Sequence, residues 1–138
     1  MTSTAENLMM TAKAFALSSE ALMLTGKPEH HLTILHLTAT SIELSFKAWI
    51  KIRGGTEEEI RALGHHLDKA YERAVQLGLS DPSGNVGLAI ATINPIYSRH
   101  FTRYFPDVDG FTGLTVESLV EVARAVALTI EGEIWPKG

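Results

Sequence analysis

The stretch IELSFKAWIKIRGGTEEEIRALGHHL, residues 42–67, contains an acid–base pair followed by a double histidine. Glu43 and Lys47 stand four positions apart with the acid first, an order that favours an ion pair on one helix face. His65 and His66 add imidazoles, which titrate near neutral pH. Two interpretations of the pair stay open: a surface ion pair that contributes ~0.3–0.5 kcal/mol, or a polar pair that faces a groove between two helices.

A second group of basic and aromatic residues lies in YSRHFTR, residues 97–103. Basic side chains suit contact with a phosphate, and histidine or tyrosine suits hydrogen bonding to a base or stacking on it. We therefore predict a ligand-binding groove lined by Glu43, Lys47, His65, Arg103 and Tyr104. The alternative is that the first three of these residues form an internal polar network that fixes the alignment of the helices. The arginines would then complement the dipole of a helix C-terminus.

Apolar residues recur at intervals of three and four along nearly the whole chain, which predicts amphipathic helices. The expected helical segments are residues 4–25, 28–53, 56–77, 86–105 and 115–135. Gly87 and Pro95 weaken the fourth segment, and we expect a kink or break near Asn94-Pro95. The prediction is one all-α domain over residues 1–138, an antiparallel bundle of four to five helices.

Several residues mark where these helices begin and end. Thr56 followed by Glu59 forms a capping box, so the third helix should begin at Thr56, after the stop at Gly54-Gly55. Thr115 is the expected N-cap of the last helix. Gly64 falls inside the third helix, where glycine costs ~1 kcal/mol relative to alanine. Such a glycine indicates close helix approach, a kink or access to a site.

Composition narrows the classes of function. The 138 residues are 45% hydrophobic and 20% charged with a net charge of −4, so no global basic field attracts nucleic acid. The absence of cysteine excludes disulfides, thiolate nucleophiles and cysteine metal sites. His30, His31 and His36 lack the i, i+4 pairing that puts two ligands on one helix face, so we expect no metal and no cofactor.

The start of the chain shows no signal-peptide pattern, and the apolar runs fall short of the ~20 residues that a membrane span needs. A soluble cytoplasmic protein without a membrane partner is therefore expected.

Three short motifs resemble those of HEPN domains, a family of helical bundles. They are E-x-x-x-K-A at residues 43–48, G-H-x-L at residues 64–67 and FTRYFPD at residues 101–107, in the family's order and spacing. The chain departs from the family at His66, where Asp or Asn is usual, and at Phe105, which separates the Tyr and Pro of the third motif. The resemblance covers most of the chain.

The resemblance implies a helical bundle that is commonly a homodimer, with links to RNA cleavage, nucleotide handling and toxin–antitoxin or defence systems. It implies RNA or a nucleotide as the ligand and an antitoxin-type protein as a candidate partner. Nuclease members carry an Arg followed a few positions later by a His, and Arg61 and His66 have that spacing. They are the candidate catalytic residues of a metal-independent ribonuclease, although the family's pair belongs nearer the last helix. A third hypothesis is a structural module whose first and last helices pair between subunits.

Overall fold

The computed structural model describes residues 4–81, 84–97 and 115–135, and these are almost entirely helical. The elements are α1 (Ala5–Met23), a short 3₁₀ turn η1 (Pro28–His30), α2 (His31–Ile52), α3 (Glu57–Leu63), α4 (Leu67–Gln76), α5 (Val86–Tyr97) and α6 (Val116–Ile134). No strand occurs among the described residues. The all-α prediction is confirmed, with six α-helices in place of four or five.

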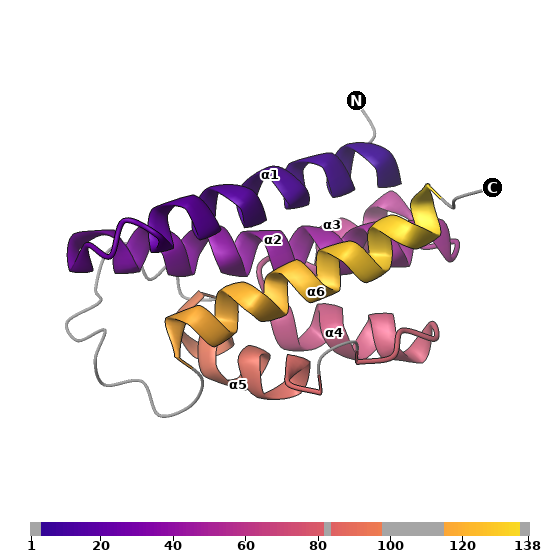
Figure 1. Ribbon diagram of the computed structural model, residues 1–138. Coiled ribbons are helices and arrows are strands. Elements are labelled where there is room, and N and C mark those ends of the chain that lie inside the picture. The colour runs from indigo at the N-terminus through magenta and orange to yellow at the C-terminus, as the bar shows by residue number, and fades with distance from the viewer. Residues whose placement is uncertain (1–3, 82–83, 98–114, 136–138) are drawn as a thin grey trace.

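Helix α2 lies at the centre of the bundle and contacts α1, α6, α4 and α5 (Figure 1). Helix α1 runs opposite to both α2 and α6, so α2 and α6 run in the same direction (Figure 1). The bundle is thus antiparallel only in part. Two ion pairs fix the α1–α6 alignment, Lys13 with Glu131 at 2.8 Å and Glu20 with Arg124 at 3.3 Å.

The core forms where the apolar faces of five helices meet around α2. Phe46 is fully buried at its centre, and its ring lies 5.5 Å from that of Tyr71. Each fully buried aliphatic side chain contributes roughly 1.5–3 kcal/mol to the free energy of folding. The other large core residues with almost no exposed surface are Met9, Ile34, Leu35, Ile42, Ile50, Leu67, Val86, Ile93, Leu119, Val126 and Ile130.

The predicted helix caps are present. The Thr56 and Thr115 hydroxyls accept hydrogen bonds from the backbone N–H groups of Glu59 and Ser118, at 3.1 and 3.2 Å. The stop after α2 requires its second glycine, because a Cβ on Gly55 would lie 2.4 Å from Cγ2 of Ile50. The chain therefore turns tightly against the end of α2 before α3 begins.

The predicted third helix was wrong in one respect, because it is two helices. Gly64 has φ 54° and ψ −133°, outside the helical region, and the chain turns there between α3 and α4. Hydrophobic spacing could not reveal this break, since Ile60, Leu63 and Leu67 keep helical intervals across it.

The expected break at Asn94-Pro95 does not occur, because α5 continues to Tyr97, and the kink expected as its alternative stays a prediction. Among the described residues, no helix is both long enough and apolar enough to span a membrane.

Candidate functional site

The break between α3 and α4 places polar groups over the middle of α2. Gly64 and His65 fall in the turn, and His66 is the N-cap residue of α4. The first N–H of α4, that of Leu67, donates a hydrogen bond of 2.8 Å to Oδ1 of Asn94 on α5. Helices α2, α4 and α5 therefore meet at this turn, and we call their meeting point the α2–α4–α5 junction.

Glu43 is the centre of the junction. Its side chain is only 5% exposed, and its carboxylate accepts three hydrogen bonds. Lys47 donates to Oε2 at 2.7 Å, the hydroxyl of Tyr97 donates to Oε1 at 2.8 Å, and Nδ1 of His65 lies 2.8 Å from Oε1. Because a buried carboxylate is stable only when paired and hydrogen-bonded, these contacts explain how the helix tolerates Glu43.

Lys47 links α2 to the turn. Its ammonium donates to Glu43 and, at 2.9 Å, to the carbonyl oxygen of Gly64. With only 10% of its side chain exposed, Lys47 joins two protein partners and has little surface left for a ligand. The ion pair predicted from the i, i+4 spacing is therefore real, and it is buried instead of lying on the surface.

His65 is the part of the junction that reaches solvent, with 51% of its side chain exposed. The ionised carboxylate of Glu43 can only accept, so Nδ1 of His65 must carry the proton in their shared hydrogen bond. The His65 ring also meets the Tyr97 ring edge-on, with centroids 5.5 Å apart. Glu43 and Tyr97 together fix the orientation of the imidazole.

Tyr97 closes the junction from α5. Its hydroxyl lies 3.1 Å from that of Thr40, which in turn donates to the backbone oxygen of His36 at 2.8 Å. The rings of His36 and Tyr97 lie 6.0 Å apart. One weak signal for this role was present in the sequence, the aromatic residue at the start of the basic and aromatic segment. The break expected near Asn94-Pro95 gave no reason to place Tyr97 beside Glu43.

The electrostatics of the junction keep Glu43 charged. Burial by itself would raise the pKa of Glu43, but the hydrogen bonds from Lys47, His65 and Tyr97 and the charge of Lys47 outweigh it and lower that pKa. For Tyr97, burial and the neighbouring Glu43 carboxylate raise the pKa well above its usual range, so the phenol keeps its proton as a donor. Glu43 is therefore a carboxylate that accepts hydrogen bonds, and Tyr97 is a phenol that donates one.

The structure brings together three of the five predicted ligand-binding residues, Glu43, Lys47 and His65. Arg103 and Tyr104 lie outside the described residues.

The candidate catalytic pair lies on two different elements. Arg61 is exposed in the last turn of α3, and His66 is exposed at the N-cap of α4. The idea that both belong to one helix is wrong because of the break at Gly64. The ribonuclease hypothesis for this pair stays a prediction.

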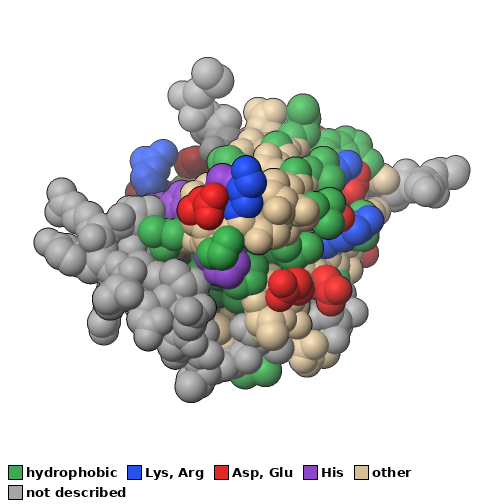
Figure 2. All heavy atoms as spheres, turned by 60° about the vertical axis from the view of Figure 1, so that its left-hand side comes forward, with side chains coloured by type: hydrophobic (Ala, Val, Ile, Leu, Met, Phe, Trp, Pro, Cys, Tyr) green, Lys and Arg blue, Asp and Glu red, His purple; other side chains and the backbone are tan. Residues whose placement is uncertain are grey.

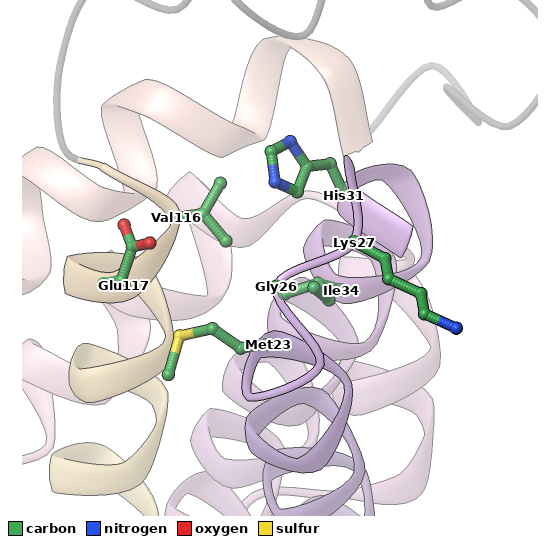
Figure 3. Close-up of a pocket in the computed structure, with 7 residues that line it drawn as sticks. All are labelled: Met23, Gly26, Lys27, His31, Ile34, Val116 and Glu117. Carbon is green, nitrogen blue, oxygen red and sulfur yellow. The ribbon is translucent and has the colours of Figure 1, made fainter. Parts of the chain in front are cut away.

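A separate hollow of about 110 Å³ lies where the C-terminal end of α1 meets the start of α6 (Figure 3). Met23, Ile34 and Val116 contribute apolar side chains to its lining, and His31 and Glu117 contribute polar ones. The Lys27 side chain extends away from the hollow in Figure 3. The hollow therefore lacks the converging charges of the α2–α4–α5 junction and is the weaker candidate.

The coloured part of the face shown in Figure 2 has no large patch of basic side chains. Among the coloured residues of that face, basic and acidic side chains are interspersed with hydrophobic ones. Nucleic-acid-binding surfaces usually gather Lys and Arg into a patch or stripe.

Comparison of the chain with family models, with curated proteins and with solved structures found no match.

Proposed function

We propose that the protein is a HEPN-like helical domain that binds RNA or a phosphorylated nucleotide at the α2–α4–α5 junction, with His65 as the contacting residue. The motifs at residues 43–48 and 64–67 on which the resemblance rests supply Glu43, Lys47 and His65, and these side chains meet in space. This convergence of two motifs from separate helices supports the family assignment independently of their order in the chain.

One observation carries the binding role: the imidazole of His65 is half exposed, while the carboxylate that orients it is almost fully buried. A histidine held by a carboxylate through Nδ1 presents a fixed ring edge, and Nε2 acts as acceptor or donor according to protonation. In its protonated form the ring makes a charge-assisted hydrogen bond to a phosphate oxygen. Phosphate-bearing ligands therefore suit this group better than neutral ones.

The remaining members of the junction position His65. Lys47 neutralises Glu43 and holds the Gly64 carbonyl, and Tyr97 supplies both a hydrogen bond to Glu43 and a ring edge against His65. Lys47 and Tyr97 also tie three helices together, as expected for an internal polar network that fixes the alignment of the helices. The proposed function needs only that the exposed imidazole, carried by this network, contacts the ligand.

The test measures binding of a fluorescent single-stranded RNA and of a fluorescent ATP analogue to the wild-type protein and to His65→Ala. We expect His65→Ala to weaken binding about tenfold, because a charge-assisted hydrogen bond contributes roughly 1.5–3 kcal/mol and ~1.4 kcal/mol corresponds to a factor of ten. The matched control is His66→Ala, which removes a second exposed histidine, the next residue in the chain, and should leave affinity unchanged.

Two results would overturn the proposal. Wild-type protein that binds neither probe removes the binding role. Equal losses in His65→Ala and His66→Ala remove the specific role of the imidazole held by Glu43. Circular dichroism of each variant separates a lost contact from a lost fold. The same RNA, followed for cleavage with wild-type protein and with Arg61→Ala/His66→Ala, tests the ribonuclease prediction.

A further inference from the structure

Helix α1 has two apolar faces, and the described part of the chain covers only one of them. The inner face, which includes Met9, Ala12 and Ala16, is buried against α2 and α6. The outer face is exposed and carries large apolar side chains, with Leu17 exposed by 62% and Leu24 by 76%. Its full set of apolar residues is Met10, Ala14, Leu17, Ala21 and Leu24, which we call the outer seam.

The spacing of the outer seam is that of a coiled-coil seam. Its residues follow one another at steps of four, three, four and three. An apolar stripe with this alternation, averaging three and a half residues, packs against a second helix through interlocking side chains. Scattered exposed leucines are ordinary on a protein surface, whereas a regular stripe from Met10 to Leu24, the C-cap residue of α1, indicates an interaction surface.

The neighbouring face of α6 extends the apolar surface. Leu128 and Trp135 are exposed by 58% and 42%, seven positions apart on one side of α6. Leu128 and Leu17 line the same shallow groove between the two helices. The ion pairs Lys13–Glu131 and Glu20–Arg124 cross this groove and form its polar borders.

We propose that the outer seam is the interface with a second copy of this chain, in which the two α1 helices pack antiparallel about a two-fold axis. The proposal concerns α1 and α6 and does not depend on the ligand site at the α2–α4–α5 junction. An isologous contact of this kind uses the same surface on both copies, so a single self-complementary stripe is sufficient.

Charge selects the second copy and the direction of pairing. When Ala14 faces Leu17 of the second copy, Lys13 of one copy lies beside Glu20 of the other, offset by ~3 Å along the axis at ~1.5 Å per residue. The two-fold axis repeats this pair, so the interface contains two contacts between a lysine of one copy and a glutamate of the other. Both lie on the α6 side, where Glu131 and Arg124 extend them into mixed-charge clusters.

Other alignments lose this complementarity. Shifting the antiparallel pair by one heptad, so that Leu17 faces Ala21 of the second copy, brings the two Glu20 carboxylates together. In a parallel pair, the charged border of each helix faces Thr11 and Ser18 of the other, which offer no charge. Like charges in contact oppose association, so the electrostatics favour the first register.

The first test measures molar mass by light scattering over a wide range of concentration, for the wild type, for Leu17→Glu and for Leu88→Glu. Leu88 is the matched control, an exposed leucine on α5 at 50% exposure and away from the outer seam. We expect a wild-type dimer that Leu17→Glu dissociates, raising the dissociation constant at least about 100-fold because a charge enters the centre of an apolar interface. Leu88→Glu should remain a dimer.

The second test uses the absence of cysteine from the chain, which makes introduced cysteines unambiguous. Met10→Cys is mixed with a size-tagged Ala21→Cys under mild oxidation, and the proposed register predicts a crosslink between them. Met10→Cys alone should not crosslink, because the two copies of position 10 would be ~16 Å apart along the axis, beyond the ~7 Å that a disulfide spans.

A protein that is monomeric at every concentration overturns the proposal. A dimer that Leu17→Glu leaves intact also overturns it, because the interface between the two copies would then lie elsewhere. So does an outer seam that binds only a helix of another protein and not a second copy of this chain. A strong Met10–Met10 crosslink overturns the antiparallel arrangement. Circular dichroism of Leu17→Glu guards against misfolding, which the exposure of Leu17 makes unexpected.

Discussion

The α2–α4–α5 junction and the outer seam of α1 reverse the usual distribution of residue types in opposite ways. The junction buries a carboxylate, an ammonium and a phenol, each with a partner within 2.9 Å. The outer seam leaves leucines and a methionine in solvent on a helix that already has a covered inner face. One region has polar groups where apolar ones are usual, and the other has apolar groups where polar ones are usual.

The two regions differ in whether a single chain supplies all their contacts. The junction supplies its own partners, so its buried charges are compensated and only His65 extends to solvent. The outer seam has no element of the described chain over it, and its apolar area is satisfied only by association. Three changes test whether the junction is complete within one chain while the outer seam is not.

Removing the carboxylate should cause the largest loss. Glu43→Ala leaves the buried ammonium of Lys47 without its negatively charged partner, and we expect the free energy of unfolding to fall by roughly 3–5 kcal/mol. Urea denaturation measures this loss, and Glu72→Ala on the exposed face of α4 is the control, with an expected change within ~0.5 kcal/mol. The double variant Glu43→Leu/Lys47→Met should recover part of the loss. A change below ~1 kcal/mol in Glu43→Ala would mean that the junction is not the compensated network described here.

Acid should produce a smaller effect of the same origin. The pKa of Glu43 is lowered in the folded protein from its ordinary value of 4.5, so its contribution to stability is fully present above pH 4.5. That contribution is lost as the pH falls through the lower folded pKa, because the unfolded chain binds the proton first. Urea midpoints measured from about pH 7 to about pH 3 should fall less steeply at the acid end for Glu43→Gln than for the wild type. Parallel curves would contradict the lowered pKa.

The outer seam should show the smallest effect on the stability of a single chain. Leu17→Gln replaces an exposed side chain that makes no core contact, so we expect the free energy of unfolding of the monomer to change by no more than ~0.5 kcal/mol. The measurement is urea denaturation at concentrations where light scattering shows a monomer. A loss of several kcal/mol would mean that the leucine is covered by its own chain, and the comparison would fail.

Much of the fold could be predicted from local patterns. The caps at Thr56 and Thr115 and the turn at Gly54-Gly55 follow from short-range chemistry, and each lies where the sequence placed it. The ion pair of Glu43 and Lys47 could likewise be predicted from its i, i+4 spacing. Its burial was not, because the apolar spacing of α2 does not say how many helices surround it.

The parts that could not be predicted depend on contacts between distant segments. Gly64 could be a helical residue by its spacing, and its turn is recognisable only once Lys47 is seen bonding its carbonyl oxygen. Tyr97 lies 54 positions from Glu43, and the proline two residues before it argued for a break. Helix α5 nevertheless continues through the proline to Tyr97, whose hydroxyl bonds Glu43.

The hydrogen bond from the Leu67 N–H to Asn94 has a consequence for the order in which the protein is made. The start of α4 is capped by a side chain that is added 27 positions later in the chain. While the polypeptide leaves the ribosome, water has to satisfy that amide until α5 has emerged and docked. The hairpin of α1 and α2 needs no later segment for its own contacts, whereas α4 acquires its final first turn only after α5 has been made.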